Sequence, residues 1–171
     1  MKTMKKILAF ALAGVMALAL LTGCGTGGSA SHKSIAKAMA DHDNGLWNNT
    51  TSITCISSAE LDALLQTWAA DPRFEAVVKA VYTDDALPTI PSGSVPSDKV
   101  VYLYCGKYDK DAGKQAINLN AHSARISGTS ALSLAAVRQI GLITTSFTND
   151  AGEKVKVRFA VVVSDIPTAT P

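Results

Sequence analysis

The spacing of apolar positions predicts two consecutive amphipathic helices in the first half of the chain. Apolar residues recur at i, i+3, i+4 and i+7 in two adjacent stretches: Leu61, Leu64, Leu65 and Trp68, then Phe74, Val77, Val78 and Val81. Residues 57–60 match a capping box, which predicts that the first helix begins at Ser57. Asp71 and Pro72 suit the N-cap and first position of the second helix.

Runs rich in β-branched and aromatic residues predict strands elsewhere. The expected strands are residues 50–56, 99–105, 114–121, 141–148 and 153–164. The turns at 109–113 and 149–152 both contain Asp-Ala-Gly, so we expect two hairpins. Residues 31–40 are expected to form a short helix that ends in a turn at 41–45. Residues 130–140 are expected to be helical, although the alternation at 132–134 would also fit a strand.

Together these elements predict a single α+β domain. We expect a mainly antiparallel sheet of about five strands with the helices at 58–82 packed on one face. Tyr102 and Tyr104 point to the opposite face from Val101 and Leu103, because side chains alternate along a strand. If that opposite face is open, these tyrosines are ligand-binding candidates. If it is covered, they belong to the core. Residues 83–98 hold three prolines and are expected to form a long surface loop.

The first 24 residues have the pattern of an export signal. Lys2, Lys5 and Lys6 precede an apolar run over 7–21, which is shorter than the roughly 20 residues of a membrane-spanning helix. The run ends in Leu21-Thr22-Gly23-Cys24, which resembles the lipobox of bacterial lipoproteins. An ordinary signal peptide with a chance cysteine, or a short uncleaved anchor, is the alternative.

The resemblance implies that Cys24 receives a diacylglyceryl group and that signal peptidase II cleaves between Gly23 and Cys24. The expected organisation is a signal peptide over 1–23, a lipidated cysteine and flexible tether over 24–31, and one extracytoplasmic domain over 32–171. Such a protein is anchored in the bacterial cell envelope, on the outer side of a membrane, by its acyl chains.

Charge and composition limit the classes of partner that we expect the protein to bind. The 171 residues contain 16 Lys and Arg and 14 Asp and Glu, but three of the lysines precede the lipobox. The mature chain therefore carries 13 basic and 14 acidic residues. A net charge of −1 argues against general electrostatic attraction to nucleic acid or anionic lipid, and an aromatic content of 6% offers few stacking platforms for bases. We therefore expect no nucleic-acid partner.

Candidate catalytic or metal-binding residues are few. Residues 41–44 are Asp, His, Asp and Asn, which are metal-ligand types, but the spacing fits no calcium loop and predicts a solvated turn. His122 stands beside Ser123, yet there is no G-x-S-x-G elbow to expose a nucleophile. The dinucleotide and phosphate-loop glycine motifs, H-E-x-x-H and C-x-x-C are also missing. The sequence thus nominates no catalytic residue, metal or cofactor.

Cys55 and Cys105 remain once Cys24 is modified. Both are expected at strand ends in an extracytoplasmic domain, where a disulfide between them is permitted. Two free thiols that pack as small hydrophobic groups are the equal alternative.

These patterns favour a membrane-anchored lipoprotein with a small binding or interaction domain whose protein or small-molecule ligand is unknown. Two other functions stay open: a small cell-surface hydrolase without a recognisable motif, and a structural component of envelope assembly.

Overall fold

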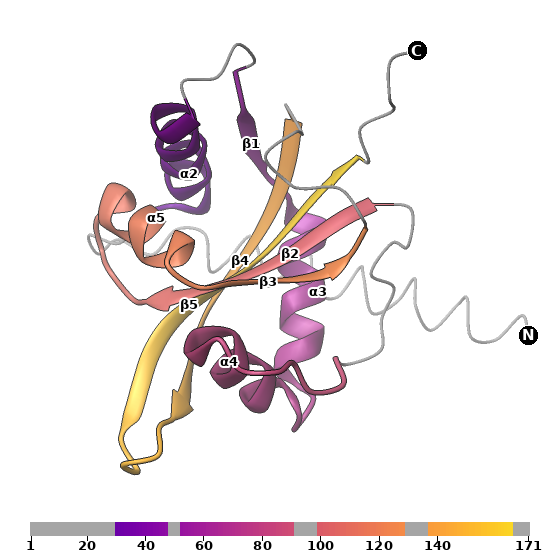
Figure 1. Ribbon diagram of the computed structural model, residues 1–171, viewed down its shortest axis with the longest axis vertical. Helices are drawn as coiled ribbons and strands as arrows, with labels where there is room; N and C mark the ends of the chain where they lie inside the picture. Colours follow the sequence, from indigo (N-terminus) through magenta and orange to yellow (C-terminus); the bar gives the residue numbers. More distant parts are fainter. Residues whose placement is uncertain (1–29, 48–51, 91–98, 129–136, 166–171) are drawn as a thin grey trace, which may run out of the picture.

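The structure, a computed structural model, describes residues 30–47, 52–90, 99–128 and 137–165. Within them, five strands form one sheet in the order β1-β4-β5-β2-β3 (Figure 1). The strands are β1 (Thr54–Ser57), β2 (Lys99–Lys107), β3 (Ser123–Ser127), β4 (Val137–Thr148) and β5 (Lys154–Asp165). Only the β1–β4 pair is parallel, and the other three pairs are antiparallel. The predicted α+β class with a mainly antiparallel five-stranded sheet is confirmed.

Helices cover both faces of this sheet. On one face, α3 (Ala59–Ala69) and α4 (Phe74–Thr83) bury Leu65, Trp68, Phe74 and Val77 against strand residues such as Leu103 and Phe159. On the other face, α2 (His32–Trp47) and α5 (Ala112–Asn120) bury Ile35, Met39 and Leu119 against strand residues such as Ile140 and Val162. The domain therefore has three layers, with the sheet in the middle.

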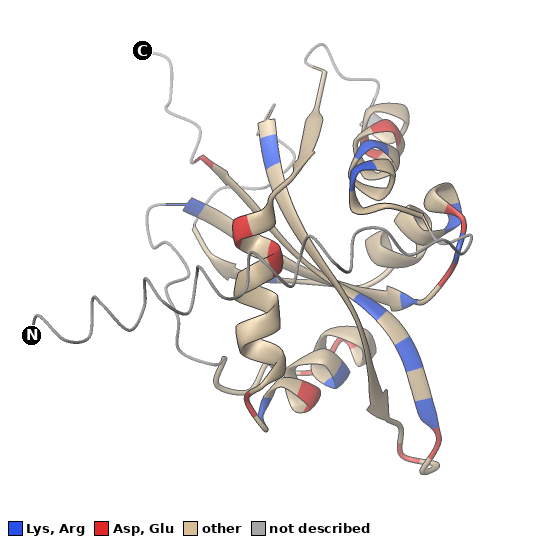
Figure 2. Ribbon diagram, turned by 180° about the vertical axis from the view of Figure 1, so that it is seen from behind, with Lys and Arg blue, Asp and Glu red and all other residues tan. Residues whose placement is uncertain are grey.

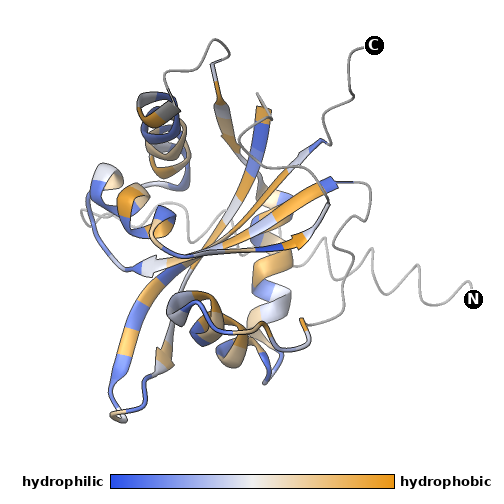
Figure 3. Ribbon diagram, viewed as in Figure 1, coloured by the Kyte–Doolittle hydropathy of each residue, from blue (hydrophilic) through white to orange (hydrophobic). Residues whose placement is uncertain are grey.

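The two halves of β5 differ in how they are covered. Residues 159–163 are apolar and buried on both faces, as expected for a central strand beneath helices on each side. Residues 154–158 instead alternate basic residues with valine, a change that is visible along the strand in Figure 3. β4 and β5 pair in register from Gln139–Val163 to Thr148–Lys154, and residues 154–158 with the facing residues 144–148 form the end of this hairpin. The hairpin extends beyond the helix layers (Figure 1).

The prediction of a strand over 114–121 is wrong. These residues belong mostly to α5, whose N-cap Asp111 accepts a hydrogen bond from the Lys114 backbone at 2.9 Å. Gln115 is fully buried and forms hydrogen bonds with the backbone of Lys107 and Asp109. The next strand along the chain that pairs with β2 is β3, which begins only at Ser123, so the expected tight hairpin at 109–113 is replaced by a helical connection.

Other boundaries also differ from the prediction. The helix expected to begin at Pro72 with Asp71 as its N-cap begins instead at Phe74, with Arg73 at the N-cap position. The first described helix continues through 41–45 to Trp47, so these residues are not a solvated turn. Residues 137–140 belong to β4 and not to a helix, because buried and exposed side chains alternate there with the period of a strand. Residues 130–136 lie outside the described part. The N-cap of α3 is Ser58, not Ser57, since the Ser58 hydroxyl accepts from the Leu61 amide.

The loop predicted over 83–98 is described only in part. Residues 84–90 carry no regular structure, and Leu87 and Ile90 pack against the cluster beneath α3 and α4. Across the described ranges, no helix has both the length and the apolar character needed to cross a membrane.

Candidate functional site

The two cysteines of the domain lie far apart and are both free. Cys55 is on β1 and Cys105 on β2, with β4 and β5 between them. Three strand spacings amount to about 14 Å, whereas the Cα atoms of a disulfide lie within about 7 Å. Cys55 also packs with the cluster beneath α2, while Cys105 belongs to the cluster on the other face. The disulfide alternative is therefore contradicted.

The face that carries the two tyrosines is covered. Tyr104 is 9% exposed within the cluster beneath α2 and α5, and Tyr102 packs at its border. Their ring centroids are 6.2 Å apart. Of the two alternatives, the covered face is the observed one, and the tyrosines do not form an open binding surface.

A polar cluster lies next to Tyr104, between α2 and the sheet. The Arg138 side chain is only 4% exposed and forms an ion pair with Asp43 of α2. His42 Nδ1 lies 3.5 Å from the other Asp43 oxygen and 3.0 Å from Asn120 Nδ2 of α5. The sequence placed His42 and Asp43 in a solvated turn. Because the helix continues, Asp43 contacts Arg138 of β4 and His42 contacts Asn120 of α5 instead.

Burial controls the chemistry of this α2 polar cluster. It raises the pKa of the Cys55 thiol to about 11, with the positive charge of Arg138 opposing the shift and the negative charge of Asp43 adding to it. Burial likewise raises the pKa of Tyr104 well above its usual value. Both groups are therefore protonated at neutral pH. The cluster supplies no ready nucleophile, and its ion pair and hydrogen bonds hold α2 and α5 against the sheet.

His122 has an acidic partner that the sequence did not reveal. Its Nδ1 atom lies 2.9 Å from Asp84, the residue that ends α4 in a left-handed conformation with φ of 57°. Tyr82 stacks beside the imidazole with ring centroids 5.1 Å apart. Such a pair could orient a general base. However, among the described residues no serine, threonine or cysteine side chain forms a hydrogen bond with His122.

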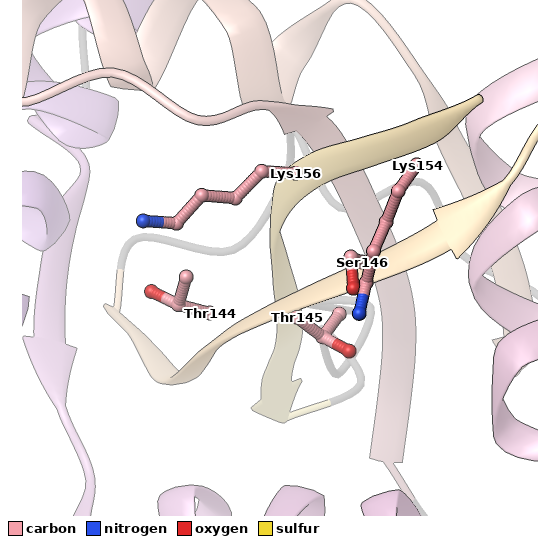
Figure 4. Close-up of a pocket in the computed structure, with 5 residues that line it drawn as sticks. All are labelled: Thr144, Thr145, Ser146, Lys154 and Lys156. Carbon is pink, nitrogen blue, oxygen red and sulfur yellow. The ribbon is translucent and has the colours of Figure 1, made fainter.

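An open groove lies on the β4–β5 hairpin. Its volume is about 410 Å³. Five residues line it: Thr144, Thr145, Ser146, Lys154 and Lys156. Figure 4 shows these side chains reaching into the groove from both strands. Every polar side chain in this hairpin groove is a hydroxyl or an ammonium group, and the lining contains no carboxylate. The arrangement suits an anionic ligand.

The backbone of β4 adds donors at the same place. The Leu142 amide donates to Asp62 at 2.7 Å and the Thr148 amide donates to Glu75 at 2.8 Å, so both point away from β5. Amides two residues apart in a strand point the same way, which directs those of Thr144 and Ser146 outward as well. The carboxylates of α3 and α4 thus satisfy the two flanking amides of this edge, and no side chain in the described part of the chain bonds the two amides between them.

The basic residues of the hairpin share one face of β5. Lys154, Lys156 and Arg158 are two positions apart, and Figure 2 shows basic positions following one another along this strand. Lys156 Nζ lies 4.0 Å from the centre of the Tyr108 ring, and the Arg158 guanidinium lies 5.3 Å from it. Within the described ranges, Lys154 and Lys156 form no ion pair with a carboxylate.

The sequence analysis missed the hairpin groove although a signal was present. The stretch Lys-Val-Lys-Val-Arg at 154–158 places three cations on one face of a strand that it correctly predicted. The opposing hydroxyls of Thr144 and Ser146 follow from the hairpin register. The Asp43–Arg138 pair had no such signal, because it joins residues 95 positions apart.

Neither the arrangement of metal-ligand side chains nor the comparison with known proteins indicates a function. In the described part of the chain, no group of three histidine, cysteine or acidic side chains is placed to hold a metal ion. No protein-family model matches the chain, and no match was found among curated proteins or solved structures.

Proposed function

We propose that the protein is a lipid-anchored component of the bacterial cell envelope whose domain binds an anionic ligand in the hairpin groove. The anchor is Cys24, for which the lipobox-like Leu21-Thr22-Gly23-Cys24 is the support. The domain acts on the outer side of the membrane as a binding module. The observation that carries the binding function is the hairpin groove, in which two lysines without a carboxylate partner meet three hydroxyl-bearing side chains.

The hydrolase alternative has weaker support. The His122–Asp84 pair is its best feature, but catalysis by such a pair requires a nucleophile within hydrogen-bonding reach of the imidazole. The α2 polar cluster does not provide one, because burial keeps the Cys55 thiol protonated. A purely structural envelope component would not need the unneutralised lysines of the hairpin groove.

Calorimetric titration of the full-length lipidated chain in neutral detergent with tripolyphosphate tests the binding function. We expect saturable binding that weakens with salt, because exposed charge pairs are screened. Replacing Lys154 and Lys156 together with glutamine should weaken binding by at least about tenfold, since charge-assisted hydrogen bonds are the strong ones.

The matched control replaces Lys37 and Lys99 with glutamine. It removes the same formal charge, but these lysines are paired with Asp41 and Asp165. The control should bind as the unmodified chain does. No binding by the unmodified chain, or equal losses in the two double variants, would rule out the hairpin groove as the anion site.

A further inference from the structure

The end of the tether lies beside the basic face of the hairpin. Ala30 is the first described residue, and its amide donates to the Lys110 carbonyl at 2.9 Å. The Ala30 carbonyl in turn accepts from Arg158 Nη2 at 3.3 Å. Arg158 shares its face of β5 with Lys154 and Lys156. The chain therefore enters the domain beside Arg158, on the face of β5 that also carries the two lysines of the hairpin groove.

Chain length limits how far this face can be from the bilayer. Ala30 follows Cys24 by six positions, and an extended chain spans at most about 3.5 Å per position, or roughly 21 Å in total. Lys154 lies four residues along β5 from Arg158, which is about 13 Å at the usual strand rise. If Cys24 is held at the membrane surface, Lys154 and Lys156 can reach that surface.

The charges around the hairpin favour contact with anionic groups. Glu75 of α4 accepts a hydrogen bond from the amide of Thr148, the residue that pairs with Lys154 in the hairpin. Four other carboxylates belong to the turn residues Asp150 and Glu153 and to Asp109 and Asp111 before α5. Asp150 pairs with Lys79, and Glu153 accepts a hydrogen bond from Asn149. Asp109 and Asp111 accept from backbone amides of the α5 turn. None of the four lines the groove.

We propose that the hairpin groove binds the phosphate groups of anionic phospholipids, so that the domain docks with its β4–β5 hairpin on the bilayer that holds Cys24. This inference rests on the proposed anchor and anion site, and it names the source of the anion. The lipid chains keep the domain near the surface, and the lysines then fix its orientation. The opposite end of the sheet, where β1 and β4 begin and β5 ends, faces away from the membrane.

The net charge of the mature chain does not oppose this docking. Salt screens charges over about 8 Å at physiological ionic strength. The electrostatic interaction with a bilayer is therefore set by the charged residues nearest to it and not by the net charge of −1. Basic residues close to an anionic surface each strengthen binding about fivefold. The sequence argument against anionic lipid holds for the chain as a whole, whereas the distribution over the surface decides the local contact.

Acylation of individual lysines tests the proposal on the full-length lipidated chain. The protein is placed in vesicles of phosphatidylcholine alone or of phosphatidylcholine with phosphatidylglycerol. A water-soluble amine reagent is added, and the modified lysines are quantified by mass spectrometry. We expect Lys154 and Lys156 to react at least about fivefold more slowly in the anionic vesicles, with high salt removing the difference. Lys37 and Lys99 serve as internal controls and should react equally in both.

Two variants sharpen the test. Lys156→Gln should reduce the protection of Lys154 in anionic vesicles, because the cations act on the same surface. Lys99→Gln also removes one positive charge, but at the start of β2, away from the hairpin groove. It should leave the protection of Lys154 unchanged. Equal reaction rates of Lys154 and Lys156 in the two vesicle types would overturn the docking proposal.

A third condition separates the docking proposal from the proposed function. Tripolyphosphate is added to the protein in phosphatidylcholine vesicles. If it protects Lys154 and Lys156 while phosphatidylglycerol does not, the anion site stands and membrane docking fails. If neither protects them, both fail. A chain that does not stay with the vesicles at all contradicts the lipid anchor.

Discussion

At the scale of single residues, Asp43–Arg138 is the most deeply buried ion pair in the described part of the chain. The side chains are 17% and 4% exposed, so neither charge is well hydrated in the folded state. Replacing Asp43 takes away the carboxylate that faces the buried Arg138 guanidinium, and breaking such a buried ion pair typically costs about 3 kcal/mol or more. Asp43→Ala should therefore lower the free energy of unfolding by about that amount, as measured by denaturant titration.

The exposed Lys37–Asp41 pair provides the control for this prediction. Its side chains are 75% and 61% exposed, and Lys37→Ala should change stability by less than about 0.5 kcal/mol. The double variant Asp43→Ala, Arg138→Met should lose less unfolding free energy than the two single variants lose in sum, because it removes both charges of the pair together. Additive losses would show that the two side chains are not coupled.

The two thiols should react slowly in the native protein. Burial raises the pKa of Cys55 to about 11 and that of Cys105 to about 12, both above the usual 9.0. At pH 8 the thiolate fraction of Cys55 is then about 100-fold lower than that of a free thiol, and alkylation should slow by the same factor. The rate should rise about tenfold per pH unit until pH 11.

The raised thiol pKa values also give stability a pH dependence. Between pH 9 and about 11, the unfolded chain has lost the thiol proton that the folded chain retains, so the stability falls as the pH rises through this window. Intact mass with and without reduction provides the accompanying check. A native mass about 2 Da lower than the reduced mass, the loss of two hydrogens on bond formation, would contradict the free thiols.

At the scale of elements, Gly141 allows α3 to pack closely on β4. A Cβ atom at this position would lie 2.5 Å from the carbonyl carbon and from the Cβ of Leu61, so Gly141→Ala has to displace the helix. We expect a loss of about 2 kcal/mol or more in the free energy of unfolding. Gly45→Ala in α2 meets nothing within 4 Å and should stabilise by about 0.5–1 kcal/mol. Equal effects of the two substitutions would contradict this packing.

How far the sequence predicts each element depends on how local its signal is. The apolar spacing at 61–68 and 74–81 and the turn at 149–152 are local, and α3, α4 and the β4–β5 hairpin follow from them. The sequence did not predict α5 because Gln115 is polar yet fully buried. Only its hydrogen bonds with the backbone of residues 107 and 109 explain this burial. The apolar pair Ala116 and Leu119, three residues apart, was the helical signal that could have identified α5.

At the scale of the whole molecule, the candidate site depends on where the hairpin leaves the helix layers. The cations at 154–158 could be read from the sequence, but not that Lys154 and Lys156 are exposed whereas Arg158 is buried, because this depends on how far other elements cover β5. The tyrosine face was nominated on strand alternation alone, and α2 and α5 cover it. The extent of helical cover is a long-range property, which explains why the sequence identified the sheet better than the site.

The central claim is that a lipid on Cys24 holds this domain at a membrane, and one measurement tests it directly. The protein is purified from bacterial membranes and digested with trypsin, and the mass of its N-terminal peptide is determined. The account predicts a peptide that begins at Cys24 and carries a diacylglyceryl group on the sulfur. A mature chain that begins at another residue, or one in which Cys24 is unmodified, would contradict it.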